Sequence, residues 1–497
     1  MSTRARAGAP PFEPSFAGLL FLVALIPRLV LALAWASEPI WDGIYYAYGG
    51  RRIAAGLGYS EDVWTDGVAV WHPWCHYPVG YSAFLAAFYR VLGDGPRVTA
   101  CANALVGALL ALVTWALARQ ALSEGRSRIA GLLVAFHPGL VVYSALVMTE
   151  QLAALLTLTA FWIAVRDRST QLRGMRGLVL GALVLGIGAL VRPQALLCAP
   201  FLALVLLRDA GSRRDGCRAS WYPTGWKRIG AGAVLACAVA LVPVMPWTAR
   251  NCHVMDGCAL VSTNGGWNLA IGSFPRANGR FQTLHASDGC REVTGQVQQD
   301  RCWLAYGIAQ IKETPWRWLG LVPAKLGYTF DHESFAIEYL HEGRPQRWPE
   351  PTRVLGRTVL TTFHRLLLCA SVLSCLAFRT RGRASAQVLV ALSAMLLTWL
   401  ACGDTPVFWP LAVFVAVVPW LPIPGHPAWS PALLLPIVLL GTTIVTHAVF
   451  FGEDRYHIVV SPVLCLLAAA ALRKPDHGKP HKTEARHAAS EDEAHRT

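Results

Sequence analysis

Long apolar stretches recur along most of this sequence, and they limit its possible folds more than any other feature. Each has about 17 to 22 mostly apolar residues, the length that an α-helix needs to cross ~30 Å of hydrocarbon. Only 15% of the residues are charged and 54% are hydrophobic, whereas a soluble domain carries charge on about a quarter of its residues. The sequence therefore predicts an all-α polytopic membrane protein with about 12 transmembrane helices.

Polar segments separate the expected spans. The stretches on either side of Arg192 form either two short helices or one long kinked element. The first stretch is long and follows several arginines, so we expect an uncleaved first helix, with a cleaved signal peptide as the competing interpretation. The spans lie at roughly residues 15–36, 97–118, 128–143, 149–165, 176–191, 193–207, 229–247, 356–378, 386–402, 406–421, 431–450 and 457–472.

The net charge of +14 is concentrated in four short segments between expected spans. Segments 119–128, 166–176, 208–228 and 379–383 hold 16 Lys and Arg against 4 Asp and Glu, a net charge of +12. All four fall on the same side of the expected topology, and an excess of basic residues marks the cytoplasmic side. We therefore expect these segments and both termini in the cytoplasm. Membrane topology explains the basicity, and nucleic acid is not an expected partner.

This topology divides the chain into five parts. Within the first outer loop, residues 76–93 carry apolar residues at helical spacing but are too few to cross a membrane, so we expect interfacial helices in that loop. The parts are a cytoplasmic N-terminal tail (1–14), a transmembrane module of spans 1–7 (15–247) that includes the first outer loop (37–96), a large outer loop region between spans 7 and 8 (248–355), the C-terminal transmembrane helices (356–472) and a disordered cytoplasmic tail (473–497).

Four of the 13 cysteines share the large outer region, where an oxidising compartment permits disulfide bonds. Four cysteines allow three connectivities, and the sequence does not choose among them. We expect at least one bridge. No CxxC pair or His cluster accompanies these cysteines, so metal binding by them is the weaker interpretation. The four are Cys252, Cys258, Cys290 and Cys302.

Ionisable residues gather at the outer ends of the expected spans. Asp42 follows the first span, Glu150 begins another, and Arg192 interrupts the apolar sequence GALVRPQALL. The last outer turn, GEDRYH, contains Arg455 and Tyr456. Ionisable groups near membrane depth cost several kcal/mol unless they are paired or hydrated, so they tend to be functional or mutually neutralising. Each alone could be an ordinary interfacial residue, but their location on one face favours a shared cavity.

A carboxylate beside several cations suits group transfer from a lipid phosphate. Arginine offers phosphate forked hydrogen bonds and lysine offers a point charge. Asp42 could accept a proton from an attacking hydroxyl while cations stabilise the departing phosphate. The sequence contains neither G-x-x-x-x-G-K-[ST] nor G-x-G-x-x-G, so a nucleotide-driven mechanism has no support. A donor that is already activated on a lipid is favoured instead.

Six motifs between about residues 16 and 472 are informative as an ordered set. They are WDGIYYAYGGRRIAAGLGYS, HYPVGYSAFLAAFYRVLG, HPGLVVYSALVMTEQLAALLTL, LVLGIGALVRPQALL, PWTARNCHVMDGCALVSTNGGWNLAIGS and GEDRYHIVVSPVL. In this order they resemble the GT-C superfamily of membrane glycosyltransferases, in the branch that contains bacterial protein O-mannosyltransferases and lipid A aminoarabinose transferases.

This resemblance implies roles for particular residues. Asp42 matches the catalytic acid of the first outer loop, which acts as base toward the acceptor hydroxyl, and Glu150 matches an acid that supports the acceptor or the donor sugar. The expected donor is a sugar on a polyprenyl monophosphate, and the transfer would invert the anomeric carbon. We assign Arg192, Arg250, Lys325, Arg455 and Tyr456 to the donor phosphate, and Tyr46, Tyr59, His76, Tyr77 and His137 to the substrate cavity.

Two positions depart from the family pattern. Gly43 stands where many relatives carry a glutamate directly after the catalytic aspartate, which argues against a role that needs paired acids. Val79 stands where a second proline is frequent. No cofactor is expected, and a divalent metal is not expected in this branch.

The expected function is sugar transfer from a polyprenyl-phosphate donor to a hydroxyl of a lipid, glycan or protein, on the periplasmic face of a bacterial inner membrane. A ligase or polymerase of surface polysaccharide would also need outer cations, and it remains the alternative. A lipid-linked sugar transporter would show broken helices near the midplane and related halves, and neither is clear here. A scaffold without catalysis leaves the one-sided acids and cations unexplained.

Overall fold

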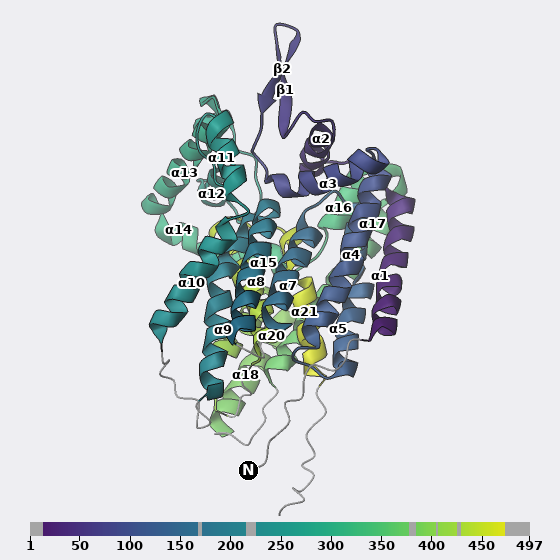
Figure 1. Cartoon of the computed structure of the whole chain (residues 1–497), viewed down its shortest axis with the longest axis vertical. Helices are drawn as coiled ribbons and strands as arrows, with labels where there is room; N and C mark the ends of the chain where they lie inside the picture. The colour runs from purple at the N-terminus through teal and green to yellow at the C-terminus, as the bar shows by residue number, and fades with distance from the viewer. Residues whose placement is uncertain are drawn as a thin grey trace, which may run out of the picture.

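The computed structural model describes residues 13–166, 171–214, 225–376, 384–403, 406–424 and 429–472. Most of these residues are helical, and the helices stand side by side in a bundle (Figure 1). Segments from the first and the large outer loop gather at one end of the bundle, which we call the loop end. The C-terminal tail, most of the N-terminal tail and parts of the basic segments lie outside the described residues.

Five helices are long and apolar enough to cross a membrane, and two bent helix pairs also pass that test when each pair counts as one span. The first pair is α5 (Glu124–Phe136) with α6 (Pro138–Val142) and η1 (Tyr143–Ala145), bent by 51°. The second is α10 (Trp226–Leu241) with α11 (Met245–Val254), bent by 54°. Prolines stand at both breaks, and proline cannot donate the hydrogen bond that continues a helix. The five single helices are α1 (Pro14–Trp35), α4 (Pro96–Ala118), α8 (Gln171–Val191), α17 (Glu350–Cys375) and α20 (Pro431–Val449).

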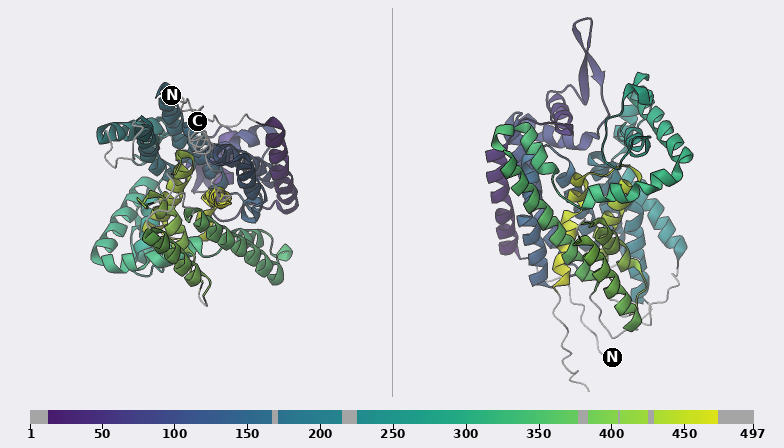
Figure 2. Two further views of the ribbon diagram at one scale, coloured as in Figure 1. Left: turned by 90° about the horizontal axis from the view of Figure 1, so that it is seen from below. Right: turned by 180° about the vertical axis from the view of Figure 1, so that it is seen from behind.

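The remaining expected spans coincide with shorter helices, so the number of about 12 spans stays a prediction. They are α7 (Glu150–Arg166), η2 (Pro193–Cys198) with α9 (Ala199–Arg214), α18 (Ala384–Ala401), α19 (Trp409–Val417) with η6 (Val418–Trp420), and α21 (Ser461–Ala471). α21 lies inside the bundle against α5, α17 and α20 (Figure 2), and its residues 461–469 are buried. A helix surrounded by protein need not match the thickness of the lipid.

A buried arginine donates hydrogen bonds to backbone carbonyls at the bend of the first helix pair. The guanidinium of Arg28, on α1, donates to the carbonyls of Val134 at 2.8 Å and Ala135 at 2.7 Å, at the end of α5. Gly107 of α4 makes room for it, since a Cβ there would lie 2.4 Å from Arg28 Nε. The arginine stabilises the bend because an unsatisfied carbonyl costs several kcal/mol in hydrocarbon.

The all-α expectation is wrong in one place. β1 (Ser60–Thr65) and β2 (Val68–Pro73) form an antiparallel hairpin that projects from the loop end (Figure 1). The turn residues Asp66 and Gly67 have φ of 51° and 77°, the left-handed values that an Asp-Gly pair adopts in two-residue hairpin turns. The sequence signal was therefore this pair, flanked by runs of β-branched and aromatic residues.

Two helices flank the hairpin. α2 (Asp42–Ala54) precedes it and α3 (Val79–Leu92) follows it, and the two pack against each other. At Gly80 a Cβ would lie 2.6 Å from the carbonyl of Leu190, so α3 also closely approaches the end of α8. The helix expected within residues 76–93 is present, and it packs on protein along its buried face, which includes Tyr81 and Leu85.

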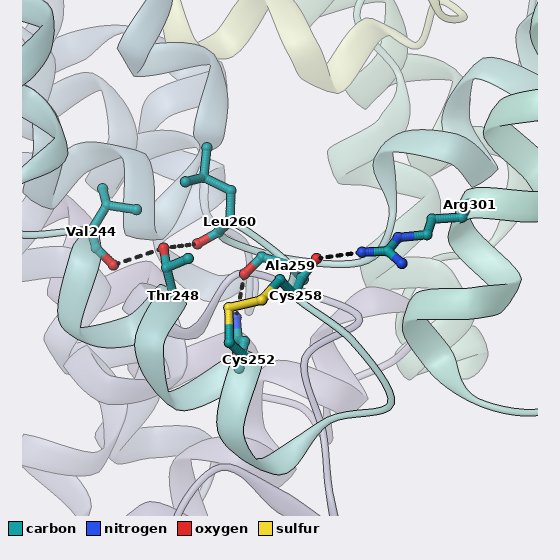
Figure 3. The surroundings of a disulfide bond; sticks show 8 residues. Val244, Thr248, Cys252, Cys258, Ala259, Leu260 and Arg301 are labelled. Atoms are coloured by element: carbon teal, nitrogen blue, oxygen red, sulfur yellow. Dashed lines mark hydrogen bonds between the residues drawn. A yellow bond between two sulfur atoms is a disulfide. The ribbon is translucent and has the colours of Figure 1, made fainter.

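The large outer region is helical and carries two disulfide bonds. Cys252 joins Cys258, and Cys290 joins Cys302, which is one of the three possible connectivities. Figure 3 shows the first bond at the end of α11, where the Thr248 hydroxyl donates to the Leu260 carbonyl at 2.7 Å. The helices here are α12 (Gly265–Ser273), α13 (Gln296–Glu313), α14 (Pro315–Gly320), α15 (Val322–Phe330) and α16 (Phe335–Gly343).

Candidate active site

Asp42 is the first residue of α2, and it receives hydrogen bonds on both carboxylate oxygens. The Tyr77 hydroxyl donates to Oδ1 at 2.7 Å, and Nη1 of Arg455 donates to Oδ2 at 2.6 Å. Arg455 belongs to η7 (Asp454–Val459), 413 positions away along the chain. A helix N-terminus also favours negative charge. The first and the last outer loop therefore meet at this carboxylate.

The surroundings of Asp42 keep it ionised. Burial alone raises the pKa of its carboxyl, but the charge of Arg455 and the hydrogen bond from Tyr77 outweigh burial, and the pKa lies below its ordinary value. Burial and the charge of Asp42 raise the pKa of Tyr77, so its hydroxyl stays protonated. Burial lowers the pKa of His76 to about 4, so this ring is neutral at pH 7.

Arg455 lies between acids and aromatic rings. Its Nε is 2.8 Å from Oε2 of Glu453, and its guanidinium carbon is 5.2 Å from the ring centre of Phe335 and 5.0 Å from that of Tyr456. Its side chain is 13% exposed. This cation is thus held in place by its neighbours and remains slightly exposed.

A second ion pair lies beside the first. Nη2 of Arg192, just after α8, is 3.0 Å from Oε1 of Glu150, the first residue of α7. Glu150 is only 1% exposed, and its Oε2 has no hydrogen-bond partner among the described residues. Arg192 also contacts the Tyr456 ring at 5.3 Å, as Arg455 does. Tyr456 therefore links the two arginines in one group.

A narrow cavity adjoins this group. Its volume is about 30 Å³, and Arg192, Tyr456 and His447 are among its lining residues. That volume accommodates about one or two waters. A lipid-linked phosphate therefore needs side chains to move before it can occupy this region.

An aromatic pocket adjoins the Asp42 site through Tyr77. It has a volume of about 230 Å³ and shares Tyr77 with the aspartate site. His76 contacts the Tyr77 ring at 4.9 Å. The sequence analysis assigned Tyr45, Trp74 and Gln296 no role in the site. Tyr45 and Trp74 lie in the aromatic sequences IYYAY and WHPWCHY, whereas nothing in the sequence around Gln296 indicated it. The lining residues are Tyr45, Trp74, His76, Tyr77 and Gln296.

Two tyrosines assigned to the substrate cavity contact Tyr77, which lines the pocket. Tyr46 is buried, and its ring contacts those of Tyr77 at 5.2 Å and Tyr81 at 5.4 Å. The hydroxyl of Tyr59 donates to the Tyr77 carbonyl at 3.2 Å. Both therefore hold Tyr77 in position.

Three other assigned residues have contacts elsewhere. Nη1 and Nη2 of Arg250 donate to the carbonyls of Trp74 at 3.1 Å and Tyr59 at 2.6 Å, so this guanidinium fastens the two ends of the hairpin. Lys325 Nζ donates to the Val449 carbonyl at 3.0 Å. His137 is buried, and its ring contacts Phe363 at 4.8 Å. Their roles in phosphate or substrate binding stay predictions.

The glycine after Asp42 has a steric explanation. A Cβ at Gly43 would lie 2.4 Å from the Tyr339 hydroxyl and 3.1 Å from the Val147 carbonyl. The Tyr339 hydroxyl in turn accepts a hydrogen bond from Ile40 N at 3.2 Å. An acidic side chain at this position has no room, so Asp42 is followed by a glycine where many relatives carry a second acid.

Glu333, His364 and His457 form a separate buried group whose ligand atoms lie within 4.8 Å of one another. These residue types could hold a metal ion, which the sequence did not lead us to expect. The group shares η7 with Arg455.

Residues 76–248 match the family model described as dolichyl-phosphate-mannose-protein mannosyltransferase. The matched segment contains Tyr77, Glu150 and Arg192 but neither Asp42 nor Arg455. This match, over less than half of the chain, supports the resemblance to the GT-C superfamily of membrane glycosyltransferases that rested on the ordered motifs.

Solved structures that this chain matches include the archaeal oligosaccharyltransferase AglB from Archaeoglobus fulgidus, in complex with an inhibitory peptide and a dolichol-phosphate. Its identity is 14% and its TM-score 0.45, and the match covers 93% of this chain and 50% of that one. ArnT from Cupriavidus metallidurans bound to undecaprenyl phosphate has 14% identity and a TM-score of 0.36, with 93% of this chain and 78% of that one covered. This chain thus spans about half the length of AglB. No curated protein matches it.

Proposed function

We propose that this protein transfers a sugar from a polyprenyl-phosphate donor to an acceptor hydroxyl, with Asp42 as the general base. The observation that carries this proposal is the Asp42 carboxyl group, held between a hydroxyl donor and an arginine. A carboxylate can take the proton of an attacking hydroxyl, and an arginine can stabilise the phosphate that departs. The family match over residues 76–248 supports glycosyl transfer as the class of reaction.

The acceptor would reach Asp42 from the aromatic pocket. This pocket contains Tyr77, which already contacts the carboxylate. The acceptor oxygen would form a bond to the anomeric carbon while its proton passes to Asp42. The bond between that carbon and the phosphate oxygen would break, and its electron pair would remain on the polyprenyl phosphate. An attack from the side opposite the phosphate would invert the anomeric carbon.

The donor phosphate would bind on the side of the two arginines. Arg455 holds the Asp42 carboxylate in the structure, and this pairing lowers the basicity of Asp42. A phosphate that competes for Arg455 would release Asp42 from part of this interaction and raise its basicity. The base would then reach full strength only when the donor is present. Such coupling would keep Asp42 from removing the proton of the acceptor hydroxyl while the donor is absent.

We place this reaction on the outer face of a bacterial inner membrane. The basic segments predict that the loop end faces away from the cytoplasm. Two disulfide bonds at that end suit an oxidising compartment. The donor lipid would lie in the outer leaflet, and the acceptor would be a lipid, a glycan or a protein.

The test measures transfer of labelled sugar from polyprenyl-monophosphate donors by purified protein. Asp42→Asn removes the base and should lower the rate by about 10²- to 10⁴-fold. Asp62→Asn is the matched control, because Asp62 is in the same outer loop and also pairs with an arginine, Arg52. Unchanged turnover in Asp42→Asn would remove this residue from the mechanism. Turnover only with diphosphate-linked oligosaccharides would favour the ligase or polymerase alternative.

A further inference from the structure

Glu333, His364 and His457 come from three segments and meet in the protein interior. Glu333 precedes α16, His364 lies within α17 and His457 within η7. Their exposed fractions are 1%, 0% and 0%, and the atoms that could bind a metal lie within 4.8 Å of one another. Buried ionisable groups need a partner that neutralises or hydrogen-bonds them.

Backbone carbonyls fix the tautomers of both histidines. Nδ1 of His457 is 2.7 Å from the Thr329 carbonyl, and Nε2 of His364 is 2.9 Å from the Phe330 carbonyl. A carbonyl oxygen can only accept, so each of these ring nitrogens carries a proton and donates it. In a neutral imidazole the other nitrogen is then unprotonated and presents a lone pair. These lone pairs are at Nε2 of His457 and Nδ1 of His364.

When both histidines are neutral and Glu333 is ionised, the unprotonated nitrogens and the carboxylate face one another without a proton donor between them. Nε2 of His457 is 3.3 Å from Oε2 of Glu333. Nδ1 of His364 and Oε1 of Glu333 have no hydrogen-bond partner among the described residues. Buried acceptors left without a donor cost about 1–3 kcal/mol each. A cation in their midst removes this cost.

We propose that Glu333, His364 and His457 bind a divalent transition-metal ion, with zinc as the best match. Two imidazoles and one carboxylate form a common zinc ligand set. Histidines that bind metals commonly donate their other ring N–H to a carbonyl or carboxylate, which fixes the ring orientation, and both histidines do so here. The ring centres are 3.8 Å apart in a stacked arrangement, so ion binding tilts the rings until their in-plane lone pairs converge.

This ion connects the segments that position Arg455. His457 lies two residues after Arg455 in η7. On the other side, Oδ2 of Asp454 accepts a hydrogen bond from Phe335 N at 2.7 Å, at the start of α16. Metal binding thus ties η7 to α17 and to the loop before α16, and it holds the arginine that pairs with Asp42. The proposal goes beyond sugar transfer and does not depend on it.

The test measures the metal content of the full-length protein, purified in detergent after growth in zinc-supplemented medium and dialysed. Wild type should hold about one zinc per chain, and Glu333→Gln and His364→Ala should each retain at least tenfold less. His341→Ala is the control, because its Nδ1 also faces a backbone carbonyl, that of Trp348, but it lies outside the group. If the wild-type protein holds no stoichiometric zinc, the group is a simple imidazolium–carboxylate pair and the proposal is overturned. Variants that keep their zinc would also overturn the proposal.

A second measurement covers the case in which the variants fail to fold. Wild-type protein stripped with a chelator is titrated with Zn²⁺, Co²⁺ or Mg²⁺, and its Tm is recorded. We expect Zn²⁺ and Co²⁺ to raise the Tm and Mg²⁺ to leave it unchanged, because nitrogen ligands favour the first two ions. Bound Co²⁺ should also give visible ligand-field absorption. The absence of both effects in wild-type protein would contradict the site, whatever the activity.

Discussion

At Asp42, burial and ion pairing act on the same carboxyl in opposite directions. Burial raises its pKa, whereas Arg455 and Tyr77 lower it. The effect of Arg455 and Tyr77 is the larger, so the pKa lies below its ordinary value. The group is therefore a carboxylate over the whole physiological pH range, and only acid would remove the proposed base. Proton uptake by the free enzyme should limit the rate only at low pH.

Replacing Tyr77 by Phe tests this balance. Tyr77→Phe keeps the ring but removes the donor to Oδ1, so the pKa of Asp42 should rise. The acid limb of the pH profile of kcat/KM should move to higher pH, since this limb reports the free enzyme. Tyr48→Phe, whose hydroxyl contacts Arg52, is the control. If the acid limb of the pH profile does not move, the hydrogen bond from Tyr77 does not lower the pKa of Asp42.

The absence of a side chain at Gly43 leaves room for the Tyr339 hydroxyl. Gly43→Ala would place a Cβ 2.4 Å from the Tyr339 hydroxyl and should destabilise the fold by about 1–3 kcal/mol. Adding Tyr339→Phe removes the atom that the Cβ meets, so the double variant should recover part of the loss. Gly18→Ala, with no atom within 4 Å of its Cβ, should leave the Tm nearly unchanged. Thermal unfolding in detergent measures all three, and equal effects at Gly18 and Gly43 would refute the steric explanation.

At the scale of elements, aspartates from distant segments cap two helices. Asp454 in η7 accepts from the first amides of α16, and Oδ1 of Asp331 accepts from Phe408 N and Trp409 N, both at 2.7 Å, at the start of α19. The first amides of a helix have no partner within it, so each cap satisfies them. These caps join segments that apolar packing alone would not align.

Asp454→Asn should loosen the junction of η7 and α16. An amide is a weaker acceptor than a carboxylate, so hydrogen exchange should rise in residues 334–343 and 454–459, with a loss of about 1 kcal/mol. Sugar transfer should fall as well, because Arg455 is the next residue. Asp331→Asn makes the same change at α19 and serves as control. Hydrogen-exchange mass spectrometry distinguishes the two, and unchanged exchange around η7 would show that the cap does not hold this segment.

At the scale of the whole molecule, the loop end collects the hairpin, α2, α11 and α13 (Figure 1). Asp42 begins α2, and Cys252 of α11 and Cys302 of α13 each belong to a disulfide bond. The linker between α4 and α5 lies at the opposite end of the bundle (Figure 1). If the loop end faces outward, the two ends should differ in their accessibility from outside the cell.

Thiol labelling of intact cells tests this orientation. Thr65→Cys, in the hairpin, should react with a membrane-impermeant maleimide, whereas Ser123→Cys, between α4 and α5, should react only after the cells are broken. The exposed Cys402 is replaced by Ser beforehand, and the parent protein gives the background. The reverse pattern would place Asp42 in the cytoplasm and overturn the proposed sidedness.

Local sequence determined the helical membrane architecture, the ordered GT-C motifs and the candidates Asp42, Glu150 and Arg192. Apolar length and charge bias are properties of short segments, so they can be read without a structure. The hairpin was also readable from its Asp-Gly turn, although the expectation of helices alone missed it. Apolar length in the sequence does not decide the number of spans, because several short helices, such as α21, are buried within the bundle.

Tertiary structure alone decided which charges meet. Asp42 and Arg455 are 413 positions apart, and nothing in either local sequence indicates their contact. Arg250 and Lys325 carry the same charge as Arg455, yet their donors contact backbone carbonyls. Glu333, His364 and His457 likewise form a group only after three segments pack together. The sequence by itself determined which residues could carry charge, whereas packing determined their partners, because pairing depends on distances of a few ångströms between segments far apart in the chain.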